Sequence, residues 1–133
     1  MSQITESTTA IVSTDTTLAN TVAATFTPEV DFRRCIGGVV QIKFQFATAP
    51  TADKTLDLYL LPALASGTDY DVYSQGRNIL LGRVKVEAVT TVQRLSILFD
   101  AVNCPYGKLA LYNNATGQTV TINKLTVGVR RVV

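Results

Sequence analysis

The chain has 133 residues, 47% hydrophobic and 17% charged, which corresponds to one domain with a core and excludes an intrinsically disordered protein. Its formal net charge of +2 is too small to indicate nucleic acid or an anionic membrane as a partner. It contains no histidine and no tryptophan, which excludes histidine-based catalytic triads and the usual histidine-ligated zinc sites.

The opening segment is rich in threonine: nine of the first 28 residues are Thr and none is Gly. Thr is β-branched and favours extended backbone. We therefore predict an extended N-terminal arm over residues 1–14 that a partner protein orders, followed by a domain over 15–133 whose first strand covers 17–27. A helix over 18–26 is the competing interpretation, because three apolar residues there are spaced four apart, but the Thr content opposes it.

From residue 39 onward, apolar residues recur at every second position, the pattern of strands with one face on a core. Segments rich in Gly, Pro, Asn and Asp separate the runs and predict turns. The alternation predicts strands over 39–46, 55–60, 80–87, 94–99 and 108–112.

The last segment changes the parity of its apolar positions. They are even-numbered up to Ile122 and odd-numbered from Leu125 to Val129. One inserted residue has this effect on a strand, so the sequence predicts a β-bulge around Asn123-Lys124.

Together these segments predict about eight or nine short strands, and each apolar face requires a second sheet to cover it. The expected fold class is therefore all-β: a single-domain β-sandwich with a jelly-roll or Greek-key arrangement and an extended Thr-rich N-terminal arm.

The two cysteines, Cys35 and Cys104, lie far apart and form no Cys-x-x-Cys motif, which argues against a metal site or a redox motif. We interpret them as small buried apolar side chains. Whether they pair in a disulfide depends on their distance in the fold.

The sequence shows no targeting or catalytic motif. Its first residues lack the basic and apolar regions of a signal peptide, and its longest apolar run is far shorter than the ~20 residues of a spanning helix. Gly37-Gly38 opens a strand rather than a helix, so it is not a phosphate-binding loop, and a Ser or Cys nucleophile has no histidine base. We expect a soluble chain made in a cytoplasm, with no enzymatic activity, cofactor, metal or small-molecule substrate.

Two arginine doublets and two tyrosines are the candidate partner-binding residues. Arg is enriched at interfaces and can bind carboxylates with two hydrogen bonds. Each tyrosine lies on the polar parity of its strand, so we expect the ring outside, where Tyr offers a large contact area. The candidates are Arg33, Arg34, Tyr59, Tyr112, Arg130 and Arg131.

A broader basic surface is an alternative to ordinary solvated arginines. It would combine the doublets with four further cations, although RNA binding requires more basic residues with interleaved aromatics. These cations are Arg77, Arg83, Lys85 and Arg94.

Two stretches carry a resemblance to a known family. They are Leu56-Asp57-Leu58-Tyr59-Leu60-Leu61-Pro62-Ala63-Leu64, followed by Gly67-Thr68-Asp69-Tyr70, and Pro105-Tyr106-Gly107-Lys108-Leu109-Ala110-Leu111-Tyr112-Asn113-Asn114-Ala115-Thr116-Gly117. Within residues 39–130, the order of strands and loops resembles the jelly-roll capsid decoration (cement) proteins of tailed bacteriophages. The Thr-rich opening segment has no counterpart in that family.

The resemblance implies a virion structural protein that decorates or cements a bacteriophage capsid. Its partner would then be the major capsid protein, it would form a homo-oligomer, and it would be located in the virion after synthesis in the host cytoplasm. Repeated copies would convert a modest affinity into strong stabilisation of the particle.

Two other functions are alternatives. The first is a glycan- or receptor-binding module of a phage tail spike or fibre, which the absence of Trp disfavours although Tyr can stack on sugars. The second is the main coat protein of a small virus, which the strand pattern at the end of the chain disfavours, because the coats of small RNA phages end in helices.

Overall fold

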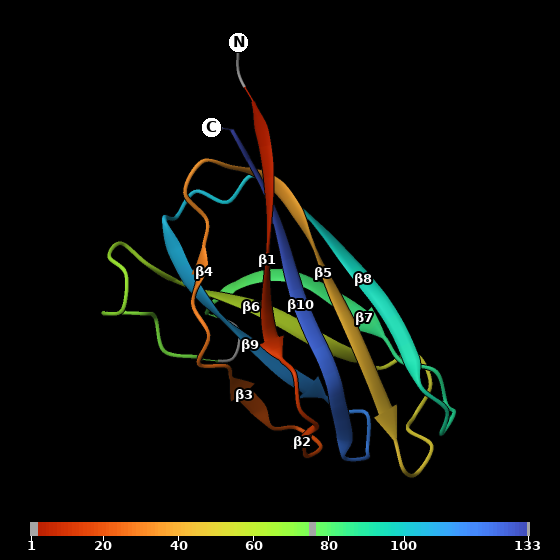
Figure 1. Ribbon diagram of the computed structural model, residues 1–133. Helices are drawn as coiled ribbons and strands as arrows, with labels where there is room; N and C mark the ends of the chain where they lie inside the picture. Colours follow the sequence, from red (N-terminus) through yellow and green to blue (C-terminus); the bar gives the residue numbers. More distant parts are fainter. Residues whose placement is uncertain (1–2, 75–76, 133) are drawn as a thin grey trace.

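The computed structural model describes residues 3–74 and 77–132, which fold into two antiparallel β-sheets and contain no helix (Figure 1). The predicted all-β class is therefore confirmed. The alternative helix over 18–26 is wrong, because this segment contains no helix and includes the end of one short strand, Thr16–Leu18, and all of another, Ala23–Thr25. Met1, Ser2 and Val133, at the ends of the predicted arm and domain, lie outside the described residues.

Sheet A has the strand order β1–β10–β5–β8, and β2 continues along β10 beyond the end of β1. Its strands are β1 (Ile4–Val12), β2 (Thr16–Leu18), β5 (Cys35–Phe46), β8 (Gln93–Asp100) and β10 (Val120–Val132).

Sheet B has the order β3–β9–β6–β7, and β4 pairs with β9. Its strands are β3 (Ala23–Thr25), β4 (Val30–Asp31), β6 (Thr55–Ala63), β7 (Ile79–Lys85) and β9 (Tyr106–Asn114).

The connectivity is that of a jelly roll. The chain passes from sheet A (β1, β2) to sheet B (β3, β4), returns to β5, makes the β6–β7 hairpin in sheet B, and then alternates through β8, β9 and β10. A jelly roll consists of two four-stranded sheets, and strands that are consecutive in the sequence lie in different sheets for most of the chain. Here β2 shares an edge with β1, and β4 shares an edge with β3, so each sheet is four strands wide. The predicted jelly-roll sandwich is thus confirmed.

The inward faces of both sheets form one hydrophobic core. Alternate residues of β5, β6, β9 and β10 point between the sheets and are almost completely buried. The largest of them are Ile42, Phe44, Phe46, Leu56, Leu58, Leu60, Leu109, Leu111, Ile122 and Leu125.

The predicted change of face in the last strand is also confirmed. In the register between β10 and β5, Ile122 pairs with Phe44 and Lys124 pairs with Lys43, so Asn123 is the inserted residue. This bulge keeps both Ile122 and Leu125 buried. It also determines which side chains of β10 point outward beyond it.

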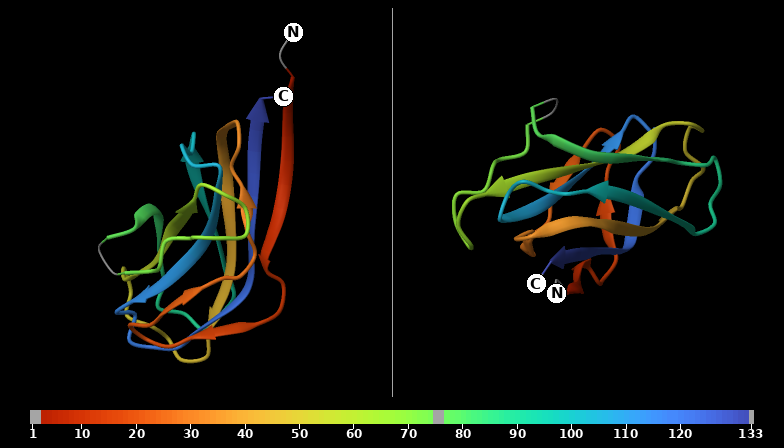
Figure 2. Two further views of the ribbon diagram at one scale, coloured as in Figure 1. Left: turned by 90° about the vertical axis from the view of Figure 1, so that its left-hand side faces the viewer. Right: turned by 90° about the horizontal axis from the view of Figure 1, so that it is seen from above.

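Residues 4–12 differ from the expected arm, because they form β1 within the sandwich. Their backbone pairs with β10 from Ile4 opposite Val132 to Val12 opposite Leu125. β1, β10 and β5 extend beyond sheet B toward the chain termini (Figure 2). Without β1, the outer edge of β10 would expose unpaired backbone groups, so the chain supplies the partner that we expected from another protein.

The predicted strand over 17–27 is divided between the two sheets. β2 pairs with β10 in sheet A, whereas β3 pairs with β9 in sheet B. The chain crosses between them near Thr21, whose φ is 60°. The sequence does not reveal such a crossing between sheets, because apolar and polar residues alternate in the same way before and after it.

The outward faces of the two sheets differ in exposure. The segment after β6 lies on sheet B, where Tyr73 packs against the outward side chains of β6 and β9. The outward side chains of β8 in sheet A, by contrast, are exposed. The outward face of sheet A is therefore the face whose side chains are accessible to a partner.

Candidate functional site

Three cations form a row across the outward face of sheet A. Lys43 on β5 lies opposite Arg94 on β8 and opposite Lys124 on β10. Arg94 and Lys124 are exposed and Lys43 is half-buried. None of the ion pairs found among the described residues involves these three side chains. Like charges directly opposite each other destabilise a sheet, and no ion pair among the described residues offsets this effect within the row. The nearest acidic group that the hydrogen bonds place is Asp15, which accepts a hydrogen bond from Asn123, the residue before Lys124.

A row of neutral hydrogen-bonding groups runs beside the cations. Gln41 lies opposite Ser96 on one side and Thr126 on the other, two residues along each strand from the cations and therefore on the same face. Both rows line a shallow hollow of about 350 Å³. The Thr126 Oγ1 atom is buried and has no hydrogen-bond partner in the part of the chain that the structure describes. The hollow thus combines amide, hydroxyl, ammonium and guanidinium groups.

An apolar row follows on the same face. Leu98 lies opposite Val39, which lies opposite Gly128, and 81% of Leu98 is exposed. This row lines a second hollow of about 480 Å³, bordered by Glu6 and Arg130. The outward face of sheet A therefore offers polar groups and an apolar platform side by side.

The second arginine doublet divides between two places, because neighbours on a strand point to opposite faces. The Arg130 Nε atom lies 3.4 Å from the Glu6 Oε1 atom at the border of the second hollow. Arg131 points the other way, toward the segment that carries Arg33 and Arg34. Of the four candidate arginines, only Arg130 therefore lies at the outward face of sheet A, and the other three cluster elsewhere.

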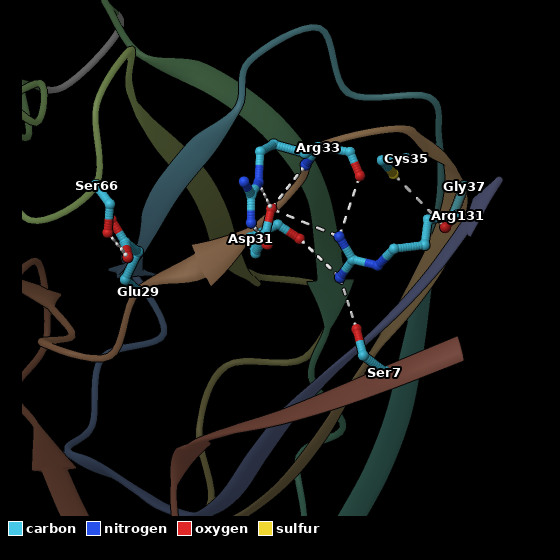
Figure 3. Close-up of polar contacts among 8 residues, drawn as sticks. All are labelled: Ser7, Glu29, Asp31, Arg33, Cys35, Gly37, Ser66 and Arg131. Atoms are coloured by element: carbon cyan, nitrogen blue, oxygen red, sulfur yellow. Dashed lines mark hydrogen bonds and ion pairs between the residues drawn. The ribbon is translucent and has the colours of Figure 1, made fainter. Parts of the chain in front are cut away.

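The three clustered arginines line one hollow together with Asp31. Figure 3 shows two of them, Arg33 and Arg131, beside the Asp31 carboxylate. Arg33 donates two side-chain hydrogen bonds to the Asp31 carboxylate, at 3.0 and 2.8 Å. These bonds lower the pKa of Asp31 to about 2. Arg131 donates to the backbone oxygens of Arg33 and Asp31 and to the Ser7 hydroxyl. Arg33 and Arg131 thus connect β1, β4 and β10.

The predicted exposure of Tyr59 and Tyr112 is wrong. Both side chains point outward from sheet B, as their parity indicates, but only 6% and 8% of these residues is exposed. The Tyr73 ring packs over them at centroid distances of 5.5 and 6.4 Å. The reason is that the segment after β6 folds back onto this face, which an alternating strand pattern does not reveal. These two rings are part of a small second core.

The remaining tyrosines occupy the same side of the molecule. Lys108 lies 4.3 Å from the centroid of the Tyr70 ring, and Arg33 lies 5.2 Å from the centroid of the Tyr106 ring. Tyr70 also donates a hydrogen bond to Glu29, and this bond lowers the pKa of Glu29. All five tyrosines of the chain are thus engaged in contacts with other residues of the chain on the outward side of sheet B.

The broader basic surface does not form as a unit. Arg83 approaches Asp57, whose side chain is 1% exposed, at 3.4 Å on the outward face of sheet B. Lys85, two residues further along β7, faces the same way. Arg94 alone of the four additional cations lies on sheet A, where Lys43 and Lys124 accompany it.

The described residues contain no group of three or more His, Cys, Asp or Glu arranged to hold a metal ion. Cys35 is buried, Cys104 is half-buried, and both are free thiols. Across 3–74 and 77–132, no helix is present that is long and apolar enough to cross a membrane.

The jelly-roll topology places this chain among β-sandwich domains. Its open sheet face, which carries both polar and apolar side chains, is the candidate binding site. No protein family matches the sequence, and no curated protein is similar to it in sequence.

Solved structures with the same fold include several carbohydrate-binding modules. The CBM36-1 domain of a multidomain xylanase from the hindgut metagenome of Trinervitermes trinervoides has a TM-score of 0.57 at 10% identity, covering 92% of this chain and 96% of its own. A family 6 carbohydrate-binding module from Clostridium cellulolyticum, in complex with xylose, has a TM-score of 0.52 at 16% sequence identity. The match covers 81% of this chain and 72% of that module's chain. A CBM4 structure has a TM-score of 0.52 at 10% sequence identity, and the match covers 86% of this chain and 69% of that one. At these identities the likeness shows the fold alone.

Sequence reasoning missed Lys43 and Lys124 as candidates. Each stands on the polar parity of its strand, which is the normal position of a solvated lysine. The three cations are neighbours only because β5 lies between β8 and β10 in this particular register. The parity change around Asn123 was the one available indication that Lys124 points outward.

Proposed function

We propose that this protein is a glycan-binding module and that the outward face of sheet A is its binding face. Of the three functions that the sequence left open, this one receives the most support from the fold shared with carbohydrate-binding modules. Jelly rolls also include viral capsid domains, so the fold by itself does not decide between them.

The observation that carries the proposal is the arrangement of the three rows on an uncovered face. A glycan presents many hydroxyl groups together with apolar C–H surfaces. Gln41 and Ser96 offer hydrogen-bond donors and acceptors, and Leu98 offers an exposed apolar surface beside them. A few placed polar groups next to an apolar surface are typical of sites that orient a small ligand.

The opposite face of the sandwich is less suited to this role. Tyr59 and Tyr112, which would be the natural platforms for a sugar ring, are covered by Tyr73. The faces of Tyr70 and Tyr106 carry cationic side chains of the same chain. Glycan binding on sheet B would first require these internal contacts to be lost.

The test is a glycan array followed by calorimetry on the best ligand. Replacing Gln41 and Ser96 together by Ala removes two hydrogen-bonding side chains and is expected to weaken binding by about tenfold. The matched control replaces Ser13 and Thr48, two exposed loop residues, by Ala and is expected to leave the affinity unchanged. The proposal is refuted if no glycan binds saturably, or if both double variants lose affinity equally.

A virion structural protein is the second candidate, and a different observation favours it. Exposed apolar side chains gather at the open edge between β7 and β8, where Ile79, Leu80 and Leu98 line a hollow of about 650 Å³. Exposed apolar patches mark protein contacts, and the expected partners are a major capsid protein and further copies of this chain. Mass spectrometry of purified particles tests this candidate, and absence of the protein from every particle preparation would exclude it.

A further inference from the structure

We propose that the glycan is acidic, and that Lys43, Arg94 and Lys124 bind its carboxylate or sulfate groups. This inference rests on the proposed function, because it assigns a ligand class to the same face. It concerns the hollow lined by the cationic row and the neutral row next to it.

The first support is the unbalanced charge. Asp31, Asp57 and Glu6 each neutralise an arginine elsewhere in the fold. The cations of the row have no such partner among the described residues, although the register sets them directly opposite one another on three adjacent strands. Such a local conflict with stability is expected at a functional site. An anion bound across the row would remove it.

The second support is the geometry of the row. Neighbouring strands lie about 4.8 Å apart, so cations on three strands span about 10 Å at their Cα atoms. Arg94 can hold a carboxylate or sulfate with two hydrogen bonds, while the ammonium groups of Lys43 and Lys124 act as adaptable point charges. A polymer with repeated acidic groups fits this row better than one isolated anion does.

The third support is the row of neutral groups beside the charges. Gln41 and Ser96 are exposed next to the cations. These amide and hydroxyl groups match the hydroxyls that flank an acidic group on a sugar. A nucleic acid is the other polyanion to consider, but binding of single strands relies on aromatic rings that stack on bases. The residues lining this hollow include no aromatic side chain, so the face favours the acidic glycan.

The experiment compares polymers that differ only in charge. Calorimetry measures binding of the full chain to polygalacturonate and to its methyl ester, and to dextran sulfate and to dextran. We expect at least one acidic polymer to bind about tenfold or more tightly than its neutral counterpart, and this preference to weaken as salt screens the charges. The two pairs distinguish carboxylate from sulfate.

Variants locate the binding site. The triple substitution K43Q/R94Q/K124Q is expected to weaken binding of the acidic polymer by about tenfold or more. The control K54Q/R77Q/K85Q removes the same net charge at exposed positions outside the row and is expected to change affinity less than about twofold. Thermal melting of both variants verifies that they fold.

The outcomes separate the two claims. Equal affinity for charged and neutral polymers overturns the acidic preference but leaves glycan binding intact. Equal losses in both triple variants also overturn it, because the attraction is then non-specific. Tighter binding of single-stranded RNA than of either acidic polymer assigns the row to nucleic acid and overturns the inference. If no polymer and no arrayed glycan binds, the proposed function itself fails.

Discussion

Replacing Gly38 by Ala is expected to destabilise sheet A strongly. A Cβ atom at this position would lie 2.2 Å from the Gly128 carbonyl oxygen and 2.4 Å from the Phe99 ring. The ring can turn away, but the carbonyl belongs to the ladder between β5 and β10 and cannot move without breaking it. Overpacking of this kind typically lowers the free energy of unfolding by about 1–3 kcal/mol. Because the clash is with backbone, we expect a loss near the top of this range.

The assay is thermal and urea unfolding followed by circular dichroism. A loss of about 3 kcal/mol corresponds to a fall of about 10 °C in Tm for a domain of this size. Gly128→Ala is the matched control on the neighbouring strand, because its Cβ atom would meet the Val39 Cγ1 atom at an ordinary 3.5 Å. We expect this control to change stability by less than about 1 kcal/mol. Equal stability of the two variants would refute the register of β5 between β8 and β10.

Three further substitutions test other parts of the fold by the same unfolding assay. Tyr73→Phe removes a buried hydroxyl that has no hydrogen-bond partner among residues 3–74 and 77–132 and should keep or raise stability by up to about 1 kcal/mol; a clear loss would show that the hydroxyl has a partner. Asp31→Asn should lose about 1 kcal/mol at neutral pH, after allowance for the exposure of the carboxyl. Because the bonds from Arg33 lower the pKa of Asp31 from 3.8 to about 2, the contribution of this carboxylate is present above about pH 4 and is lost as pH falls through about 2. A pH-independent difference would contradict this assignment. Asn113→Ala removes the fully buried amide that donates to the backbone oxygens of β2 and of the β9–β10 loop, at 3.1 and 2.9 Å, and should cost about 3 kcal/mol; a loss below about 1 kcal/mol would contradict that role.

The core and the bulge were predictable because both follow from a single local rule. Side chains two residues apart face the same way, so the apolar residues from Val40 to Phe46 identified one buried face without knowledge of any partner strand. The parity change between Ile122 and Leu125 identified the bulge in the same way, and both are buried as expected.

The covering of sheet B was not predictable from the same rule. Parity placed Tyr59 and Tyr112 outward correctly, but their burial depends on Tyr73, which arrives from a segment without a regular pattern. The Thr-rich opening raised a similar difficulty: its extended conformation follows from composition, whereas its pairing with β10 follows from which edge remains open. Both outcomes depend on contacts between segments distant in sequence.

The candidate site illustrates this limit most clearly. Nothing in the separate surroundings of Lys43, Arg94 and Lys124 connects them, since each is one polar residue in an alternating strand. Only the order β10–β5–β8 and its register make them neighbours. The sequence therefore supplied the cations, and the topology assembles them into a row.

An NMR titration of the ¹⁵N-labelled chain with short acidic oligogalacturonides tests the central claim most directly. The account predicts saturable shift changes in the backbone amides of β5, β8 and β10 around Lys43, Ser96 and Thr126, and small changes around Tyr70 and Tyr106. Changes confined to sheet B and to residues 64–74, which follow β6, or no changes at all, would contradict the claim that the outward face of sheet A is the binding face.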